Sequence, residues 1–238
     1  MLHQFLASLP FMTDTRATLV MDAFLPIVKS GFMVSVPLAI ASFIIGMMIA
    51  TAVAIVRVMP KGGIFHRIVL TILRMYISII RGTPMVVQLA IVFYGLPAMN
   101  IFIAPIPAAI IGFSLNVGAY GSETVRAAIL SVPKGQWEAS FSIGMTYMQT
   151  FRRIIAPQAL RVAVPPLSNS FIGLFKETSL ASFVTVTEMF RVAQQYANMS
   201  YDFLPVYIEV GLVYWCFCWV LFVVQARLEK HFDRHVAR

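Results

Sequence analysis

No charged residue lies between Lys29 and Arg57, and a second uncharged stretch separates Arg81 from Glu123. Each stretch is longer than the roughly 20 apolar residues that an α-helix needs to cross the hydrocarbon core of a bilayer. The chain is 59% hydrophobic and only 12% charged, which is too little polar surface for a soluble domain. The sequence therefore predicts an integral membrane protein.

Prolines, glycines and polar residues divide the apolar sequence into segments that can each cross the membrane once. The second uncharged stretch is too long for one crossing, and Pro97, Asn100 and Pro105 interrupt it. The fold class that we predict is an all-α membrane protein with five transmembrane helices, over residues 31–56, 74–96, 107–130, 158–178 and 206–226. The other segments are residues 1–30 at the N-terminus, residues 131–157 between the third and fourth spans, and the basic tail 227–238.

Lys and Arg residues gather on one side of these spans. That side holds Arg57, Lys61, Arg67, Lys134, Arg152, Arg153, Arg227, Lys230, Arg234 and Arg238, whereas the opposite side holds Arg16, Lys29 and Arg191. Cytoplasmic loops carry the excess of basic residues, so the N-terminus is expected outside and the C-terminus in the cytoplasm. The same clusters explain the net charge of +8, and we expect no nucleic-acid partner. The histidines are scattered outside the spans, so no metal site is expected.

Residues 131–157 predict a helix–turn–helix hairpin on the cytoplasmic side. Residues 136–143 form two helical turns, and Gly144 suits the left-handed conformation that ends a helix. Thr146 and Gln149 have the spacing of a capping box, which opens a second helix. We expect Pro157 to end that second helix near the fourth span.

This hairpin resembles the EAA loop of the permease subunits of binding-protein-dependent ABC importers. The loop reads Glu-Ala-Ala, three residues, Gly, nine residues, Ile, one residue, Leu-Pro, and the chain matches this spacing with Ser140 and Ala156 as departures. Further segments resemble the polar amino-acid subfamily: 81–84, 123–128, 135–138, 157–159, 165–171 and 176–180. The resemblance covers about residues 31–234, and cystine-importer permeases look most similar.

The resemblance implies a type I ABC importer permease in the bacterial inner membrane, with the hairpin docked in a cleft of an ATPase subunit. The coupling residues would be Glu138, Ala139, Ser140, Gly144, Ile154 and Pro157. The chain has no Gly-x-x-x-x-Gly-Lys-Ser/Thr phosphate loop, so we expect no ATPase site of its own and no cofactor. ATP and Mg would bind the separate ATPase. The other expected partners are an extracytoplasmic amino-acid-binding protein, membrane lipid and a second permease copy, a homodimer being favoured over a pairing with a paralogue.

Polar residues recur inside the predicted spans, where ionisable groups cost roughly 2.5–3.5 kcal/mol each. Asn116, Tyr120 and Glu123 share one helix face. We expect a substrate path lined by Gln88, Asn116, Tyr120, Asn169 and Ser170. We expect gating or ion pairing from Arg81, Glu123, Arg126, Lys176 and Glu177, with Glu123 paired to Arg81 or Arg126. Pro165 and Pro166 are expected to kink the fourth span.

Other interpretations remain open for several of these residues. The amides and hydroxyls can simply hold helices together, and Lys176 can extend to the outer interface. The predicted function is import of a polar L-amino acid, with cystine favoured over glutamine, histidine or arginine. The alternative is an ATP-independent carrier or channel in which the hairpin is only a connector. An intramembrane enzyme using Glu123 is not expected, because no histidine lies in a span.

Overall fold

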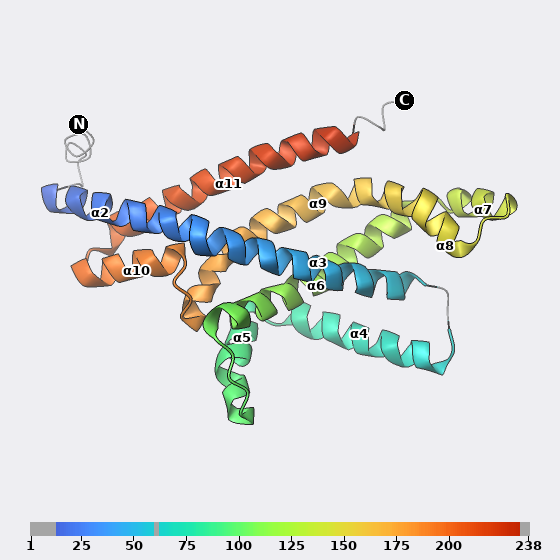
Figure 1. The fold of residues 1–238 in the computed structure, drawn as a ribbon, viewed down its shortest axis with the longest axis horizontal. Coiled ribbons are helices and arrows are strands. Elements are labelled where there is room, and N and C mark those ends of the chain that lie inside the picture. Colours follow the sequence, from blue (N-terminus) through green and yellow to red (C-terminus); the bar gives the residue numbers. More distant parts are fainter. Residues whose placement is uncertain (1–12, 60–61, 234–238) are drawn as a thin grey trace.

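The protein is helical almost throughout residues 13–59 and 62–233, which the computed structural model describes, the last three as backbone only. No strand occurs among these residues. The elements are α2 (Asp14–Ser30), η1 (Gly31–Ser35), α3 (Val36–Val58), α4 (Ile64–Gly82), α5 (Met85–Ala90), η2 (Ile91–Gly95), η3 (Leu96–Met99), α6 (Pro105–Ser131), α7 (Lys134–Ser142), α8 (Tyr147–Thr150), η4 (Phe151–Ile155), α9 (Ala156–Glu177), η5 (Thr178–Val184), α10 (Met189–Ser200) and α11 (Phe203–Asp233). Most long helices run along one common axis, with the α7–α8 hairpin at one end and α10 toward the other (Figure 1).

The first helix is continuous from Asp14 to Val58, because the π-turn η1 joins α2 to α3. Its 45 residues extend about 68 Å, more than the roughly 40–45 Å of a bilayer with its head groups. The predicted span 31–56 is therefore only part of a longer helix. The predicted N-terminal segment 1–30 is helical from Asp14 onward, and residues 1–12 lie outside the described residues.

The reason for this early start is local capping and packing. The Thr13 side chain accepts a hydrogen bond from the Arg16 backbone N–H at 3.3 Å, which caps the first turn. Ala17, Ala23 and Ile27 are fully buried on the face of α2 that packs against α10 and α11. The charged residues that interrupt the apolar sequence before residue 31 thus lie on a helix rather than end one.

The interface between α3 and α6 is built from small residues. Ser42, Gly46, Ala50 and Ala54, which recur every four residues and so share one face of α3, are all buried. A Cβ added at Gly46 would lie 2.5 Å from Val117 Cβ and 3.0 Å from the Ser114 carbonyl oxygen. The two backbones are therefore too close for any side chain at this position.

Replacing Gly46 with Val is expected to separate α3 from α6 and to prevent normal folding, because neither Val117 nor the Ser114 backbone can move freely. A Cβ added at Gly211 would have no neighbour within 4 Å, so Gly211→Val is the matched control. Size-exclusion chromatography of the detergent-extracted proteins would measure the folded fraction. A monodisperse, fully folded Gly46→Val protein would contradict this packing.

Two helices of the described chain are long and apolar enough to cross a membrane, namely 14–58 and 203–230. The bent pair formed by α4 and residues 85–99 would be a third. Helices α6 and α9 have 27 and 22 residues, or about 40 and 33 Å, which also suffices in length. They are less apolar because they carry most of the predicted site residues, so five crossings remain a prediction.

The later helices lie close to the predicted spans. Helix α6 covers 107–130, α9 begins at Ala156 and ends one residue before 178, and α11 covers 206–226. Helix α11 continues to Asp233, so the first part of the predicted tail 227–238 is helical, whereas residues 234–238 lie outside the described residues. Helix α9 runs unbroken through Pro165 and Pro166, so the two prolines do not open it, and the kink stays a prediction.

Glu188 joins α10 to α11 through a fully buried carboxylate outside the predicted spans. It caps α10 by accepting hydrogen bonds from the backbone N–H groups of Phe190 and Arg191, at 2.9 and 2.7 Å. The Tyr214 hydroxyl of α11 donates a third bond at 2.9 Å. Burial raises the pKa of Glu188 to about 7, against the opposing effect of these hydrogen bonds.

This raised pKa predicts a pH-dependent stability. The pKa of Glu188 is 4.5 in the unfolded chain and about 7 in the folded one, so the folded state holds the proton more tightly. The resulting contribution to the free energy of unfolding is complete below pH 4.5 and is lost as the pH rises through 7. The temperature of the thermal unfolding midpoint of the purified protein should therefore decrease as the pH rises from 5 to 8. In Glu188→Gln, which cannot titrate, this decrease of the thermal midpoint with pH should disappear. Identical slopes for the two proteins, followed by scanning fluorimetry, would refute the prediction.

Candidate functional site

The α7–α8 hairpin has the predicted backbone geometry. Gly144 is left-handed with φ of +81°, and the backbone N–H groups of Gly144 and Met145 bond to the Phe141 and Ser140 carbonyls at 3.0 and 3.1 Å. This pair of bonds is a Schellman motif, which satisfies carbonyls at the end of α7. Thr146 and Gln149 form the predicted capping box, with bonds of 2.9 and 3.4 Å. The turn is thus closed by local interactions.

The second helix of the hairpin does not end at Pro157, as predicted, but continues into α9. The π-turn η4 inserts an extra residue, so that the Ala156 N–H bonds to the Phe151 carbonyl five residues earlier. Pro157 then lies in the first turn of α9, where a missing N–H is tolerated. The hairpin is consequently one rigid extension of α9.

One face of the hairpin is held against the helical bundle. The Trp137 ring stacks on Tyr147 with centroids 5.1 Å apart, and Ser140 is buried. Trp137 and Ile154 pack on a buried cluster from the ends of α6 and α9, formed by Ala128, Ile129, Val132, Ile155, Ala159 and Ala163. Trp137 and Ile154 therefore hold the hairpin against the bundle, and the buried Ser140 bonds to the Gln136 carbonyl of its own helix.

The opposite face of the hairpin is exposed. It presents Glu138, Ala139 and Gly144, and Pro157 is exposed at the start of α9. Large apolar side chains are exposed beside them, with Ile143 76%, Met148 51% and Phe141 47% accessible. One carboxylate, two small residues and three apolar side chains form what we call the hairpin face, which has the composition of a protein-docking surface.

A second group of predicted residues meets at a break between α4 and α5. The two segments are bent by 111° at residues 83–84, inside the predicted span 74–96. Pro84 has no N–H and holds Thr83 in an extended conformation, so the helix cannot continue. The second predicted span is therefore broken rather than straight.

Gln88 closes this break. Its side-chain amide donates to the carbonyls of Ile80 and Thr83, at 2.8 and 3.0 Å, and contacts the Thr83 hydroxyl at 3.0 Å. Asn116 on α6 donates to the Gln88 Oε1 at 3.3 Å. With 8% of its surface exposed, Gln88 satisfies carbonyls that the break leaves without helical donors. We call Gln88, Thr83 and Asn116 the break cluster.

Arg81 and Tyr120 lie beside the break cluster and are accessible. The Arg81 guanidinium is 5.3 Å from the centre of the Tyr120 ring, and the Tyr120 hydroxyl is 3.5 Å from the Arg81 carbonyl. Both side chains are exposed. Gln88, Asn116, Tyr120 and Arg81 are thus brought together at the break.

Glu123 is paired, but its strongest contact comes from a residue that the sequence reasoning missed. Arg57 at the end of α3 bonds to the Glu123 Oε1 at 2.6 Å, and Arg126 bonds to Oε2 at 3.0 Å. Arg81, the other partner predicted for Glu123, instead packs over the Tyr120 ring. The signal was present, because Arg57 ends the uncharged stretch of the helix whose small face packs against α6.

The predicted residues on α9 do not join the break cluster. Asn169 accepts a hydrogen bond from Gln225 on α11 at 3.0 Å, and the Ser170 hydroxyl donates to the Pro166 carbonyl of its own helix. Asn169, Ser170, Lys176 and Glu177 are exposed. The expected roles of Asn169 and Ser170 on a substrate path, and of Lys176 and Glu177 in gating or ion pairing, stay predictions.

Comparisons with known proteins agree with the motifs. Residues 62–234 match the family described as binding-protein-dependent transport system inner membrane component. The L-cystine transport system permease protein TcyB of Bacillus subtilis (strain 168) is 48% identical over 241 residues, covering 98% of this chain and 100% of that protein.

Two solved structures resemble the fold. One is described as an amino acid ABC transporter with histidines, with a TM-score of 0.81 and 28% identity over 89% of this chain and 96% of that chain. The inward-facing MetNI methionine ABC transporter has a TM-score of 0.66 at 19% identity, over 93% and 99% of the two chains, and shows the shared fold alone. On the family match and the full-length relative, the chain belongs to the binding-protein-dependent transport system inner membrane components.

Proposed function

We propose that the chain is the permease subunit of an ATP-driven importer for a polar L-amino acid, with cystine as the preferred substrate. The hairpin face is the observation that supports this proposal most, because a rigid extension of α9 carries an exposed docking surface. The substrate preference follows the full-length similarity to an L-cystine permease.

The hairpin face suits a cleft on an ATPase subunit. Ala139 and Gly144 allow a partner backbone to approach closely, and Glu138 can pair with a basic side chain. Ile143 and Phe141 supply exposed apolar area that a partner would bury. Since the hairpin continues into α9, movement of the docked cleft would be transmitted along that helix.

The remaining parts of the importer are proposed as separate chains. ATP and Mg would bind two ATPase subunits, and an extracytoplasmic binding protein would deliver the amino acid. Two ATPase subunits require two hairpins and the described chain supplies one, so we favour a homodimer in the bacterial inner membrane, with the N-terminus outside.

The break cluster and its neighbours would divide the work along the substrate path. Arg81 and Tyr120 are exposed, so they are the groups that a passing zwitterion can reach, with the guanidinium as a partner for its carboxylate. Gln88 is buried and its amide is already bonded, so it would set the shape of the broken span rather than contact the substrate.

Reconstitution in proteoliposomes tests the proposal. Uptake of labelled cystine should require the chain, the ATPase, ATP and the cognate binding protein together. Unlabelled glutamine, histidine and arginine would be added in turn as competitors to define the substrate. Uptake by the chain alone, without ATPase or ATP, would instead support the carrier or channel alternative.

A further inference from the structure

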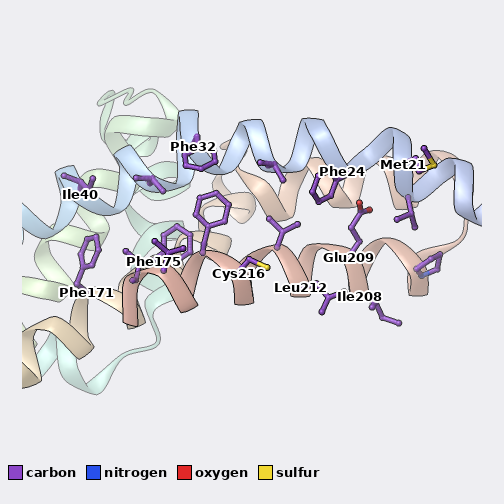
Figure 2. Close-up of a pocket in the computed structure, with 18 residues that line it drawn as sticks. Met21, Phe24, Phe32, Ile40, Phe171, Phe175, Ile208, Glu209, Leu212 and Cys216 are labelled. Atoms are coloured by element: carbon purple, nitrogen blue, oxygen red, sulfur yellow. The ribbon is translucent and has the colours of Figure 1, made fainter. Parts of the chain in front are cut away.

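An apolar groove separates the first helix from α11 (Figure 2). Its volume is about 1020 Å³. One wall comes from α2 and its continuation, including Met21, Phe24 and Phe32, and the other from α11, including Leu212 and Cys216. We call this the α2–α11 groove. None of the break-cluster residues Gln88, Thr83 and Asn116 lines it, so the groove is distinct from the path proposed above.

Among the residues that the structure describes, Glu209 is the single carboxyl group that lines the α2–α11 groove. Its side chain is 6% exposed, and neither Oε1 nor Oε2 has a hydrogen-bond partner in the described chain. Figure 2 shows the carboxyl group directed from α11 toward α2, near Phe24. Buried polar atoms in folded proteins nearly always have a partner. Both oxygens are covered in the described chain, so a ligand in the groove that carries a hydrogen-bond donor would supply one when the side chains over them move apart.

The length of the groove indicates the kind of ligand. Its lining on α11 runs from Pro205 to Leu221, which is about 24 Å along the helix. One leaflet with its head groups is about 20–23 Å thick, which is close to the length of the groove. At the deep end, Phe171 and Phe175 of α9 line the groove. The groove therefore matches one leaflet.

The position of Glu209 indicates the end at which the head group lies. It is three residues inside the predicted outer boundary of the fifth span, at residue 206, or about 5 Å deep. Acyl carbons would lie against Leu212, Cys216 and Phe217, which are deeper. Since Met21 and Phe24 on the opposite wall precede the predicted first span 31–56, the carboxyl group lies at the head-group end of the groove.

We propose that the α2–α11 groove binds one phospholipid of the extracytoplasmic leaflet whose head group carries a primary ammonium. The ammonium donates to Glu209, and an acyl chain fills the apolar part of the groove. A trimethylated ammonium has the same charge but no N–H, so it cannot make this bond. The proposal depends on the membrane placement of α11 and not on the transport reaction.

Native mass spectrometry of the purified full chain tests this proposal. The detergent-solubilised protein is incubated with phosphatidylethanolamine or with phosphatidylcholine of the same acyl chains. The wild type should retain one phosphatidylethanolamine, roughly ten-fold more than phosphatidylcholine, because one hydrogen bond to a charged group is lost with the second lipid. Glu209→Gln should abolish this preference, whereas Glu229→Gln, on the same helix outside the groove, should keep it.

A groove-filling variant and a cross-linker complete the test. Cys216→Trp should reduce retention of both lipids, because the ring occupies the groove. A benzophenone attached to Cys216 in a Cys218→Ser background should label lipid. Equal retention of the two lipids by the wild type, retention of neither, an unchanged preference in Glu209→Gln, or cross-linking of Cys216 to a second copy would each overturn the proposal. None of these readouts measures transport, so a failed lipid site and a failed importer assignment are distinguishable.

Discussion

Glu138→Arg is expected to leave the protein folded in the membrane and to uncouple ATP hydrolysis from cystine uptake. The side chain is exposed on the hairpin face, so the substitution disturbs no internal contact. Against a basic cleft it replaces an attraction with a repulsion of several kcal/mol, and uptake should fall at least roughly 100-fold. Uptake and ATP hydrolysis would be measured together in proteoliposomes that contain the complete importer.

Two further variants sharpen this experiment. Gly144→Asp places a side chain and a charge at the left-handed turn of the hairpin and should also uncouple. Asp22→Arg makes the same charge reversal on α2, near the other end of the molecule from the hairpin (Figure 1), and should leave hydrolysis coupled to uptake. Normal uptake by both Glu138→Arg and Gly144→Asp would rule out the hairpin as the coupling element.

Gln88→Leu is expected to have the second large effect, by releasing the bend between α4 and α5. Leucine has a similar volume but leaves the Ile80 and Thr83 carbonyls without their donor, at a cost of about 0.5–1.5 kcal/mol for each hydrogen bond lost. Uptake should fall at least roughly ten-fold, and the backbone amides of α5 should exchange hydrogen faster.

The matched control at the break cluster is Asn116→Ala. It removes a single hydrogen bond to Gln88 and leaves the bonds across the break intact, so its effect on hydrogen exchange should be smaller. If Gln88 contacts the substrate instead, Gln88→Leu would raise the KM for cystine and leave the exchange of α5 unchanged. That result would contradict the structural role.

The hairpin could be predicted from the sequence because it is built from local interactions. The capping box between Thr146 and Gln149 and the left-handed Gly144 act within a few residues of one another. The face of small residues on α3 can also be predicted, since a four-residue spacing places its members on one side of a helix. Residues on one face of one helix, such as Asn116 and Tyr120, were likewise placed correctly beside each other.

Features that depend on distant segments could not be predicted in the same way. Pro84 signals a possible break, but the bend of 111° also depends on Gln88 reaching back to α4 and on Asn116 from α6. The Arg57–Glu123 pair joins two helices whose relative register the sequence does not contain. Asn169, which was expected on the same substrate path, does not reach the break cluster, because it bonds to Gln225 on α11.

Sidedness of the hairpin face is the most direct test of the proposed coupling. Ala139→Cys would be introduced with Cys216 and Cys218 replaced by Ser, so that the only thiol lies on the exposed face of α7. A membrane-impermeant maleimide should fail to label intact spheroplasts and should label the protein once the membrane is permeabilised. Labelling of intact spheroplasts would put the hairpin outside the cell, where no ATPase could dock.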